Sequence, residues 1–417
     1  MIQNLFHFIK KFITAKQFLN TFRKSPKDFT RNRKVTFTTM ILLILSSLGR
    51  SIQAGIDEFI ITMNTDFDTY SKQAFSKRRQ CIKPEAFLKI LKLSSEFFYE
   101  NADFKTFHNY KILAVDGSKI DLPYNKQLMD KYGCQKGTNN SIQALASCVT
   151  DVMNNIVVDQ ILAPCCANER LLAQQHIQHL NEVKTGKEII LFDRGYPSSE
   201  LIDELEKNNM KYVMRCGSVF TKGLKKKLKG NDCVITHKFE KTKIELTMRI
   251  VSFPISSKNT EMIVTNIFDK EFKPDDFKIL YNMRWGIEKT YNCVKNMFCL
   301  ESFTGSLPDS VLQDFYAILF LYNAASVIVF ENEKKLSEKY KKRSNKLKYK
   351  TNLKMTVIKV KDILIKSLLS NSGKKRDRLF AVLSRQLERE VIPIRDNRFY
   401  ERKIKHTKHK FSQNQKL

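Results

Sequence analysis

Four side chains in the segment YNMRWGIEKTYNCVK have types and spacing that could do chemistry: Tyr281, Arg284, Glu288 and Lys295. They are three, four and seven positions apart. At about 100° per residue, a helix would place all four within an arc of roughly 60°. A carboxylate between two permanent cations suits a site that holds a metal ion and a phosphodiester together. An amphipathic helix with a solvated charged face would show the same spacing, so other segments must decide.

Two short apolar runs upstream each end at an aspartate. Residues 112–115 are followed by Asp116 and Gly117, and residues 189–192 are followed by Asp193. We interpret both runs as buried strands whose acids lie where the strand leads into a turn. Two such acids facing a third on a helix would concentrate negative charge that a divalent cation must neutralise. The pattern therefore indicates a metal site with oxygen ligands.

These motifs resemble those of DDE transposases of the IS4 group. The third motif of that group has tyrosine, two residues, arginine, three residues, glutamate, six residues and lysine, and this chain matches every position. The resemblance runs from about residue 34 to residue 305 and includes AFSKRRQCIKPEAF before the acids and LESFTG after the signature. It implies a mixed α/β fold, with a ribonuclease H-like catalytic core, an inserted antiparallel β subdomain, a helical N-terminal domain and a helical C-terminal region.

The chain has 417 residues, which is long enough for more than one packed unit. The most apolar run, residues 35–49, is shorter than the roughly 20 residues that a bilayer requires, so we expect a buried helix and no membrane partner. We expect four parts: a helical DNA-binding domain over 1–100, a catalytic domain over 101–305 with a β-rich insertion at about 217–270, a helical region over 306–400 and a basic tail over 401–417.

The formal net charge of +30 agrees with a nucleic-acid partner and predicts binding that weakens steeply with salt. Charge alone does not separate DNA from RNA or from an anionic membrane, and a lysine-rich proteome would explain part of it. The densest cluster includes Lys225, Lys226 and Lys227. We expect this cluster either to contact DNA or to form a solvated loop.

Nine cysteines without a CxxC pair, and the absence of a signal peptide, predict free thiols in a reducing bacterial cytoplasm, with the protein at the nucleoid. His176 and His179 lie three positions apart on a predicted helix; without companion ligands, we interpret them as a surface face rather than a zinc site. The other strand acids, Asp121, Asp151 and Asp159, are predicted to be surface or turn residues.

The expected chemistry is two-metal phosphoryl transfer, with Asp116, Asp193 and Glu288 holding two Mg²⁺ or Mn²⁺ ions about 3.5–4 Å apart. Arg284 and Lys295 would then bind phosphates near the cut, and Tyr281 would position the DNA strand. Glu169 is expected beside the sheet, where helix capping or an ion pair explains it as well as a role next to the metal.

The resemblance implies cleavage at the terminal inverted repeats of an insertion sequence and strand transfer into target DNA, with cut-and-paste as the expected route. A homodimer is expected because two element ends must be brought together. Two other functions fit the same residues: a ribonuclease H-like nuclease that cuts DNA without joining it, and a DNA-binding protein that has lost its chemistry. The intact set of three acids argues against the second.

Overall fold

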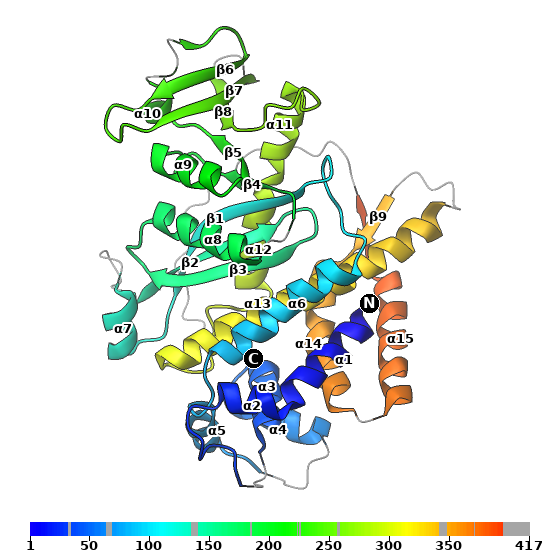
Figure 1. Ribbon diagram of the computed structural model, residues 1–417. Helices are drawn as coiled ribbons and strands as arrows, with labels where there is room; N and C mark the ends of the chain where they lie inside the picture. The colour runs from blue at the N-terminus through cyan, green and yellow to red at the C-terminus, as the bar shows by residue number, and fades with distance from the viewer. Residues whose placement is uncertain are drawn as a thin grey trace. The chain divides into compact units, whose positions relative to one another are not determined.

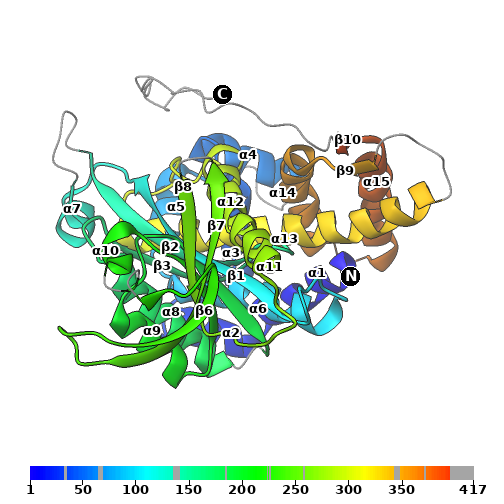
Figure 2. The same ribbon diagram turned by 90° about the horizontal axis from the view of Figure 1, so that it is seen from above.

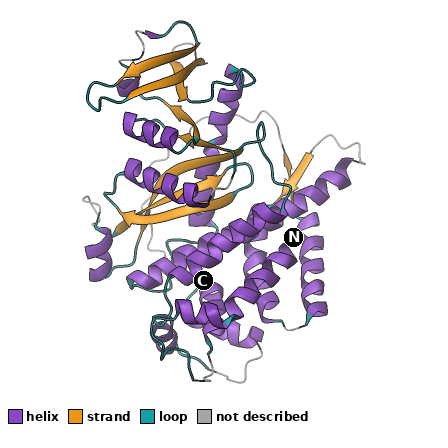
Figure 3. Ribbon diagram, viewed as in Figure 1, coloured by secondary structure: helices purple, strands orange, loops and turns teal. Residues whose placement is uncertain are grey.

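The computed structural model describes residues 1–31, 35–63, 69–134, 141–183, 186–222, 224, 227–256, 259–341, 348–370 and 372–394. The chain divides into two units, which we call the helical unit (residues 1–102, 122–128 and 294–417) and the sheet unit (residues 103–121 and 129–293). Figure 3 shows most strands in the sheet unit. The division into four parts expected from the sequence remains a prediction.

The sheet unit contains one eight-stranded sheet. Its first five strands are β1 (Lys111–Asp121), β2 (Gln143–Asp151), β3 (Ile156–Pro164), β4 (Glu188–Phe192) and β5 (Lys211–Arg215). They lie in the order β3-β2-β1-β4-β5, and β2 is antiparallel to both of its neighbours, whereas β1, β4 and β5 are parallel. This order, with the second strand reversed, is the ribonuclease H-like arrangement. The predicted mixed α/β fold class is confirmed.

Three further strands continue the sheet beyond β5: β6 (Asp232–Lys238), β7 (Glu245–Ser256) and β8 (Asn259–Thr265). They pair antiparallel with one another, and β8 pairs antiparallel with β5. Figure 2 shows the long β6–β7 hairpin from above. The predicted β-rich insertion is therefore antiparallel and is joined to the central sheet by hydrogen bonds.

Helices cover both faces of this sheet (Figure 1). On one face, α8 and α9 pack over apolar side chains that alternate along the strands, such as Val115, Val149 and Phe192. On the other face lie α11 and α12 (Figure 1). The helices of this unit are α8 (Glu169–Val183), α9 (Ser199–Lys207), α10 (Ser218–Thr221), α11 (Pro274–Met283) and α12 (Trp285–Asn296); α12 and the short α7 (Lys126–Tyr132) both cross the division between the units.

The helical unit is organised around the 34-residue helix α13, which packs against α6 and α14. By length and composition α13 could cross a membrane, but 89% of its most apolar window is buried inside the protein. The helix α3 is buried along most of its length, as predicted. The elements of this unit are α1 (Ile2–Thr14), α2 (Lys16–Phe22), α3 (Phe37–Ser47), α4 (Ile52–Met63), α5 (Lys72–Arg79), α6 (Glu85–Asn101), α13 (Pro308–Lys341), β9 (Lys348–Thr351), α14 (Leu353–Leu369), α15 (Gly373–Arg389) and β10 (Val391–Ile394).

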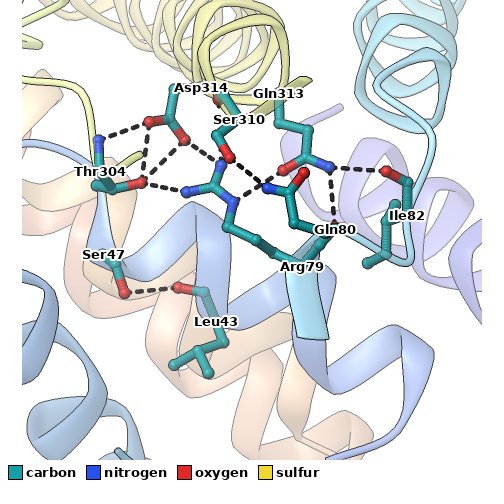
Figure 4. Close-up of polar contacts among 9 residues, drawn as sticks. All are labelled: Leu43, Ser47, Arg79, Gln80, Ile82, Thr304, Ser310, Gln313 and Asp314. Atoms are coloured by element: carbon teal, nitrogen blue, oxygen red, sulfur yellow. Dashed lines mark hydrogen bonds and ion pairs between the residues drawn. The ribbon is translucent and has the colours of Figure 1, made fainter. Parts of the chain in front are cut away.

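A buried arginine joins α5 to α13 and to the loop before α13 (Figure 4). The Arg79 side chain is 1% exposed, and each of its three nitrogens donates a hydrogen bond. The acceptors are Gln313 Oε1 at 2.9 Å, Thr304 Oγ1 at 2.7 Å, Asp314 Oδ1 at 2.7 Å and the Ser310 carbonyl at 3.2 Å. The buried charge is tolerated because the guanidinium is paired with Asp314 and each of its three nitrogens is hydrogen-bonded.

Candidate active site

The pairing of β1 with β4 brings two aspartates together. The last parallel pair joins Ala114 to Leu191, and Asp116 and Asp193 each follow two residues later. Equal offsets from the last pair put the two carboxylates at the same level of the sheet and on the same face. Two acids 77 positions apart in the chain thus become neighbours.

The prediction that β1 ends at Asp116 was wrong, whereas Asp193 does lie directly after β4 as predicted. β1 continues to Asp121, and Asp116 pairs with Cys148 of β2. The reason is that β1 has two partners of different length. Its parallel pairing with β4 stops at Ala114, but β2 keeps the backbone extended for seven more residues. Asp116 therefore lies inside a strand, where the neighbouring strand has already ended.

Burial is the dominant influence on Asp116 and raises the pKa of its carboxyl to about 6. The Gly117 N–H, which donates to Oδ1 at 2.9 Å, and the Arg284 guanidinium act in the opposite direction. The negative charges of Glu169 and Glu288 add to the effect of burial. Holding this carboxylate ionised thus costs free energy that a bound cation would recover.

Asp116→Asn is expected to stabilise the protein in EDTA at pH 7.5, by up to about 3 kcal/mol. The folded-state pKa of about 6 is higher than the ordinary value of 3.8, so the stability from this group is present below about pH 4 and is lost as pH rises through 6. The asparagine does not titrate and avoids that loss. Urea unfolding of both proteins at pH 5 and pH 7.5 measures the gain, which should be larger at pH 7.5.

The control is Asp130→Asn, which changes an exposed aspartate of α7. It should leave stability unchanged at both pH values. An equal gain from Asp116→Asn at the two pH values would contradict the assignment of the raised pKa to Asp116.

Asp193 has the opposite electrostatic setting. Burial acts to raise its pKa, but hydrogen bonds from the Arg194 N–H and the Tyr281 hydroxyl, with the charges of Arg284 and Arg215, lower it overall. The Tyr281 hydroxyl donates to Asp193 Oδ1 at 2.8 Å, and burial raises the tyrosine's own pKa to about 12. Tyr281 thus stays protonated and holds an ionised Asp193 in one orientation.

Arg284 connects the other two acids. Its Nη2 donates to Glu288 Oε1 at 2.8 Å, and its Nη1 lies 3.7 Å from Asp116 Oδ2. The side chain is 4% exposed, and its buried Nε has no hydrogen-bond partner. The three acids predicted from the sequence therefore surround one guanidinium, together with the predicted Tyr281.

The single helix expected to hold the signature is two helices that meet at Arg284, so that prediction was wrong. The N–H of Arg284 donates to Tyr281 O, and the N–H of Ile287 donates to Arg284 O, each at 3.1 Å over three residues rather than four. Tyr281 belongs to α11 and Glu288 to α12. Lys295 lies in the last turn of α12, with its Nζ 3.9 Å from Glu301 Oε1.

Gly286, two residues before Glu288, allows α12 to approach the turn after β2. A Cβ at this position would lie 2.7 Å from Val152 Cβ. Gly286→Ala should thus displace the start of α12, lower stability by about 1–3 kcal/mol and reduce DNA cleavage about tenfold. Thermal unfolding and a cleavage assay check the two effects.

Two variants accompany this prediction. Gly217→Ala is the matched control, because its Cβ would meet its nearest neighbour, the Arg194 carbonyl oxygen, at an ordinary 3.6 Å. Adding Val152→Gly to Gly286→Ala removes the clashing atom and should restore part of the activity. If Gly286→Ala had the same stability and cleavage rate as Gly217→Ala, the close contact between Gly286 and Val152 would not be needed for either property.

A buried tyrosine of α12 lies under the site. Tyr291 is buried, and its hydroxyl lies 2.9 Å from the Asp116 carbonyl oxygen and 2.7 Å from that of Ala146. It ties α12 to β1 and β2 directly behind Asp116. Its spacing of three from Glu288 and seven from Arg284 places it on the same helical side as those two residues.

Several other predicted residues lie elsewhere or outside the described part. Lys225 and Lys226 fall outside the described residues, as does the predicted basic tail over 401–417. Lys227 is exposed, and its Nζ donates to the Thr236 carbonyl of β6 at 3.1 Å. Glu169 is the first residue of α8, and its Oε1 lies 2.8 Å from where a Cβ on Gly117 would be.

The prediction of surface positions for Asp159 and His176 was wrong. Both are buried, and Asp159 Oδ2 lies 2.6 Å from His176 Nδ1 and 2.8 Å from His179 Nδ1. Asp151 is also buried, but it does precede a turn, where it accepts backbone N–H groups. Asp121, at the end of β1, accepts a hydrogen bond from Gln143.

The carboxylates fit a divalent metal ion of the Mg²⁺ or Mn²⁺ class. Asp116, Asp193 and Glu288 offer oxygen donors, which these ions prefer. Two guanidiniums act on these three negative charges. Arg284 lies between Asp116 and Glu288, with a buried Nε left unpaired, and Arg215, which acts on Asp193, is itself paired with Glu261. Negative charge thus remains in excess within the cluster, and a cation would compensate it.

Three acids gathered on one face of a ribonuclease H-like sheet are the arrangement expected for phosphoryl transfer, and comparison with protein families identifies the class of this domain. The chain belongs to the family described as "Transposase DDE domain", which matches residues 108–324, more than half of the chain. No curated protein matches. Among solved structures, the chain is similar to the piggyBac transposase of a cryo-EM synaptic complex with hairpin DNA, with 12% identity, a TM-score of 0.48, and coverage of 95% of this chain and 88% of that one.

Proposed function

We propose that this DDE transposase belongs to the IS4 group, cleaves DNA at the ends of its own insertion sequence and transfers the freed strands into target DNA, by cut-and-paste. The observation that carries the proposal is the convergence of Asp116, Asp193 and Glu288 around Arg284. Membership of the transposase family supports the reaction class. The full match to the tyrosine–arginine–glutamate–lysine signature supports the IS4 group.

Each residue of the cluster has a proposed role. Asp116, Asp193 and Glu288 would hold two Mg²⁺ or Mn²⁺ ions. Bound ions of this class activate an attacking hydroxyl and stabilise the leaving oxygen. Tyr281 keeps Asp193 oriented through its 2.8 Å hydrogen bond.

The basic residues would bind the DNA backbone. Arg284 is 4% exposed and donates to Glu288, so it would offer its planar guanidinium to a phosphate oxygen near the cut once metal ions take over the charges of Asp116 and Glu288. Lys295 would offer a point charge further along α12. The net charge of +30 supports DNA as the partner, and we propose that residues 1–100 contribute to binding the element ends. A homodimer would bring the two ends together.

A strand-transfer assay tests the proposal. Purified protein is mixed with Mg²⁺, a supercoiled target plasmid and a labelled duplex that carries the DNA flanking the gene and ends in a free 3′-hydroxyl. A transposase converts label into plasmid-sized joined products. A ribonuclease H-like nuclease would cut the plasmid or the duplex without joined products, and a DNA-binding protein without chemistry would shift the duplex but change neither DNA.

A further inference from the structure

A second cluster of ligand-type side chains lies on the opposite face of the sheet from the candidate active site. Asp159 pairs with Val149, which packs under α8, whereas Asp116 pairs with Cys148, one position along β2. Because successive side chains of a strand point to opposite faces, the two acids belong to different faces. The cluster around Asp159 is therefore separate from the acids of the candidate active site.

This cluster, which we call the Asp159 cluster, consists of Asp159, His176 and His179. One donor atom from each side chain lies within 4.8 Å of the other two. The two histidines are three positions apart on α8, so both project from one side of the helix toward β3. A strand and a helix thus present a carboxylate and two imidazoles at one point.

This donor set matches a zinc site with three protein ligands and one open position. Two imidazoles with one carboxylate are ligands that Zn²⁺ takes, at about 2.0–2.2 Å from the metal. His176 is fully buried, whereas the His179 side chain is 42% exposed and leaves a route for the ion and for a water ligand.

A hydroxyl lies behind one of the imidazoles. Ser147 Oγ is 2.9 Å from His176 Nε2, while His176 Nδ1 faces Asp159. Metal-binding histidines commonly use the second ring nitrogen in this way, because a hydrogen bond there fixes the ring orientation. Because the buried Ser147 hydroxyl contacts Nε2, the nitrogen of His176 that would face a metal is Nδ1, on the side of Asp159.

Without an ion, the same residues form hydrogen bonds of 2.6 and 2.8 Å from the histidines to Asp159. Tetrahedral zinc would need donors roughly 3.3 Å apart, so the distance from Asp159 to His176 must widen by about 0.7 Å and that to His179 by about 0.5 Å. We expect rotation of the His179 side chain, which is 42% exposed, and of the Asp159 carboxylate to supply that movement.

We propose that Asp159, His176 and His179 bind one Zn²⁺ ion that fastens α8 to the central sheet, independently of the divalent cations at the candidate active site. Since α8 begins at Glu169, next to Gly117 of β1, the ion would also fix the start of this helix near Asp116. The proposal concerns the fold of the sheet unit and does not depend on strand transfer.

The test uses untagged, full-length protein that is stripped with EDTA, dialysed and supplied with Zn²⁺. Metal content after desalting, by mass spectrometry, should be one zinc per chain. The ion should raise the thermal midpoint by a few degrees. His179→Asn should weaken zinc binding at least about tenfold and lose the thermal effect, and His179→Cys should restore both, because a thiolate is a zinc ligand.

Two controls separate this site from others. Asp116→Asn with Glu288→Gln should keep one zinc per chain, because those acids lie on the other face. His7→Asn, which removes an exposed histidine of α1, should also keep it. The proposal is overturned if the wild type retains no zinc and gives no tetrahedral spectrum with Co²⁺, or if His179→Asn retains as much zinc as the wild type.

Discussion

Replacing Asp193 with asparagine is expected to reduce DNA cleavage at least about a thousandfold, while the protein stays folded and binds DNA. The substitution keeps the shape of the side chain and its hydrogen bond from Tyr281, but removes the negative charge. A metal ligand of this kind supports several kcal/mol of transition-state stabilisation, and about 1.4 kcal/mol corresponds to a factor of ten in rate. Cleavage rates on labelled end DNA at saturating protein measure the loss.

The measurement needs a folding control and a charge control. Thermal unfolding and DNA binding of Asp193→Asn should match the wild type within error. A loss of DNA affinity would itself lower the measured cleavage rate, so it must be excluded. Asp130→Asn removes an exposed aspartate of α7 and should cleave at the wild-type rate. Cleavage by Asp193→Asn within tenfold of the wild type would remove Asp193 from the catalytic set.

Replacing Arg79 with methionine is expected to destabilise the helical unit by about 3–5 kcal/mol. The methionine fills part of the volume but leaves the buried Asp314 carboxylate without its guanidinium partner at 2.7 Å. Thr304, Gln313 and the Ser310 carbonyl lose hydrogen bonds at the same time. Hydrogen exchange of peptides from α5 and α13 measures the local loss, and urea unfolding measures the total.

Two variants make the Arg79 prediction specific. Lys77→Met changes an exposed cation two positions earlier on α5 and should cost less than about 0.5 kcal/mol. Asp314→Leu combined with Arg79→Met removes both charges and should recover part of the stability, because no buried charge is left alone. If Arg79→Met were as stable as Lys77→Met, the buried network would not hold α5 to α13.

The identity of the three acids could be predicted because their signals are local. An apolar run that stops at an aspartate, and a glutamate in a spaced motif, can be read from a few neighbouring residues. The end of β1 could not be predicted in this way. Asp116 remains in a strand because of hydrogen bonds to β2, about 30 residues further along the chain, and its own neighbours carry no sign of them.

The division of the signature into two helices at Arg284 also could not be predicted from the sequence. A continuous helix and two helices joined by three-residue hydrogen bonds place Tyr281, Arg284 and Glu288 on similar sides, so the spacing does not distinguish them. The close contact of Gly286 with Val152 involves a turn more than 130 positions away. Tertiary packing, rather than helix propensity, decides the local geometry here.

The Asp159 cluster also depends on contacts between residues that are far apart in the sequence. The spacing of His176 and His179 was visible, but a pair of histidines on a helix is usually a surface feature. Their partner Asp159 lies 17 residues before His176, on a strand whose register the sequence did not reveal. A buried carboxylate between the two histidines is what makes them candidate metal ligands. Because Asp159 was predicted to lie at the surface, the sequence did not indicate this cluster.

The structure gives a physical role to two segments of the family resemblance. AFSKRRQCIKPEAF and LESFTG supported the family resemblance, but their role was not evident from the residues. Arg79 in the first donates to Thr304 in the second at 2.7 Å, and both contact Asp314 of α13. The two segments are thus parts of one buried polar network.

Cleavage of a plasmid that carries the native flanking DNA is the decisive measurement for a metal-dependent centre at Asp116, Asp193 and Glu288. Wild-type protein and Glu288→Gln are compared in Mg²⁺, Mn²⁺, Ca²⁺ and EDTA. Cuts at the element ends should appear in Mg²⁺ or Mn²⁺, be absent in EDTA, and disappear in Glu288→Gln under every condition. Binding without cleavage in all four conditions, or equal cleavage by Glu288→Gln, would contradict this assignment.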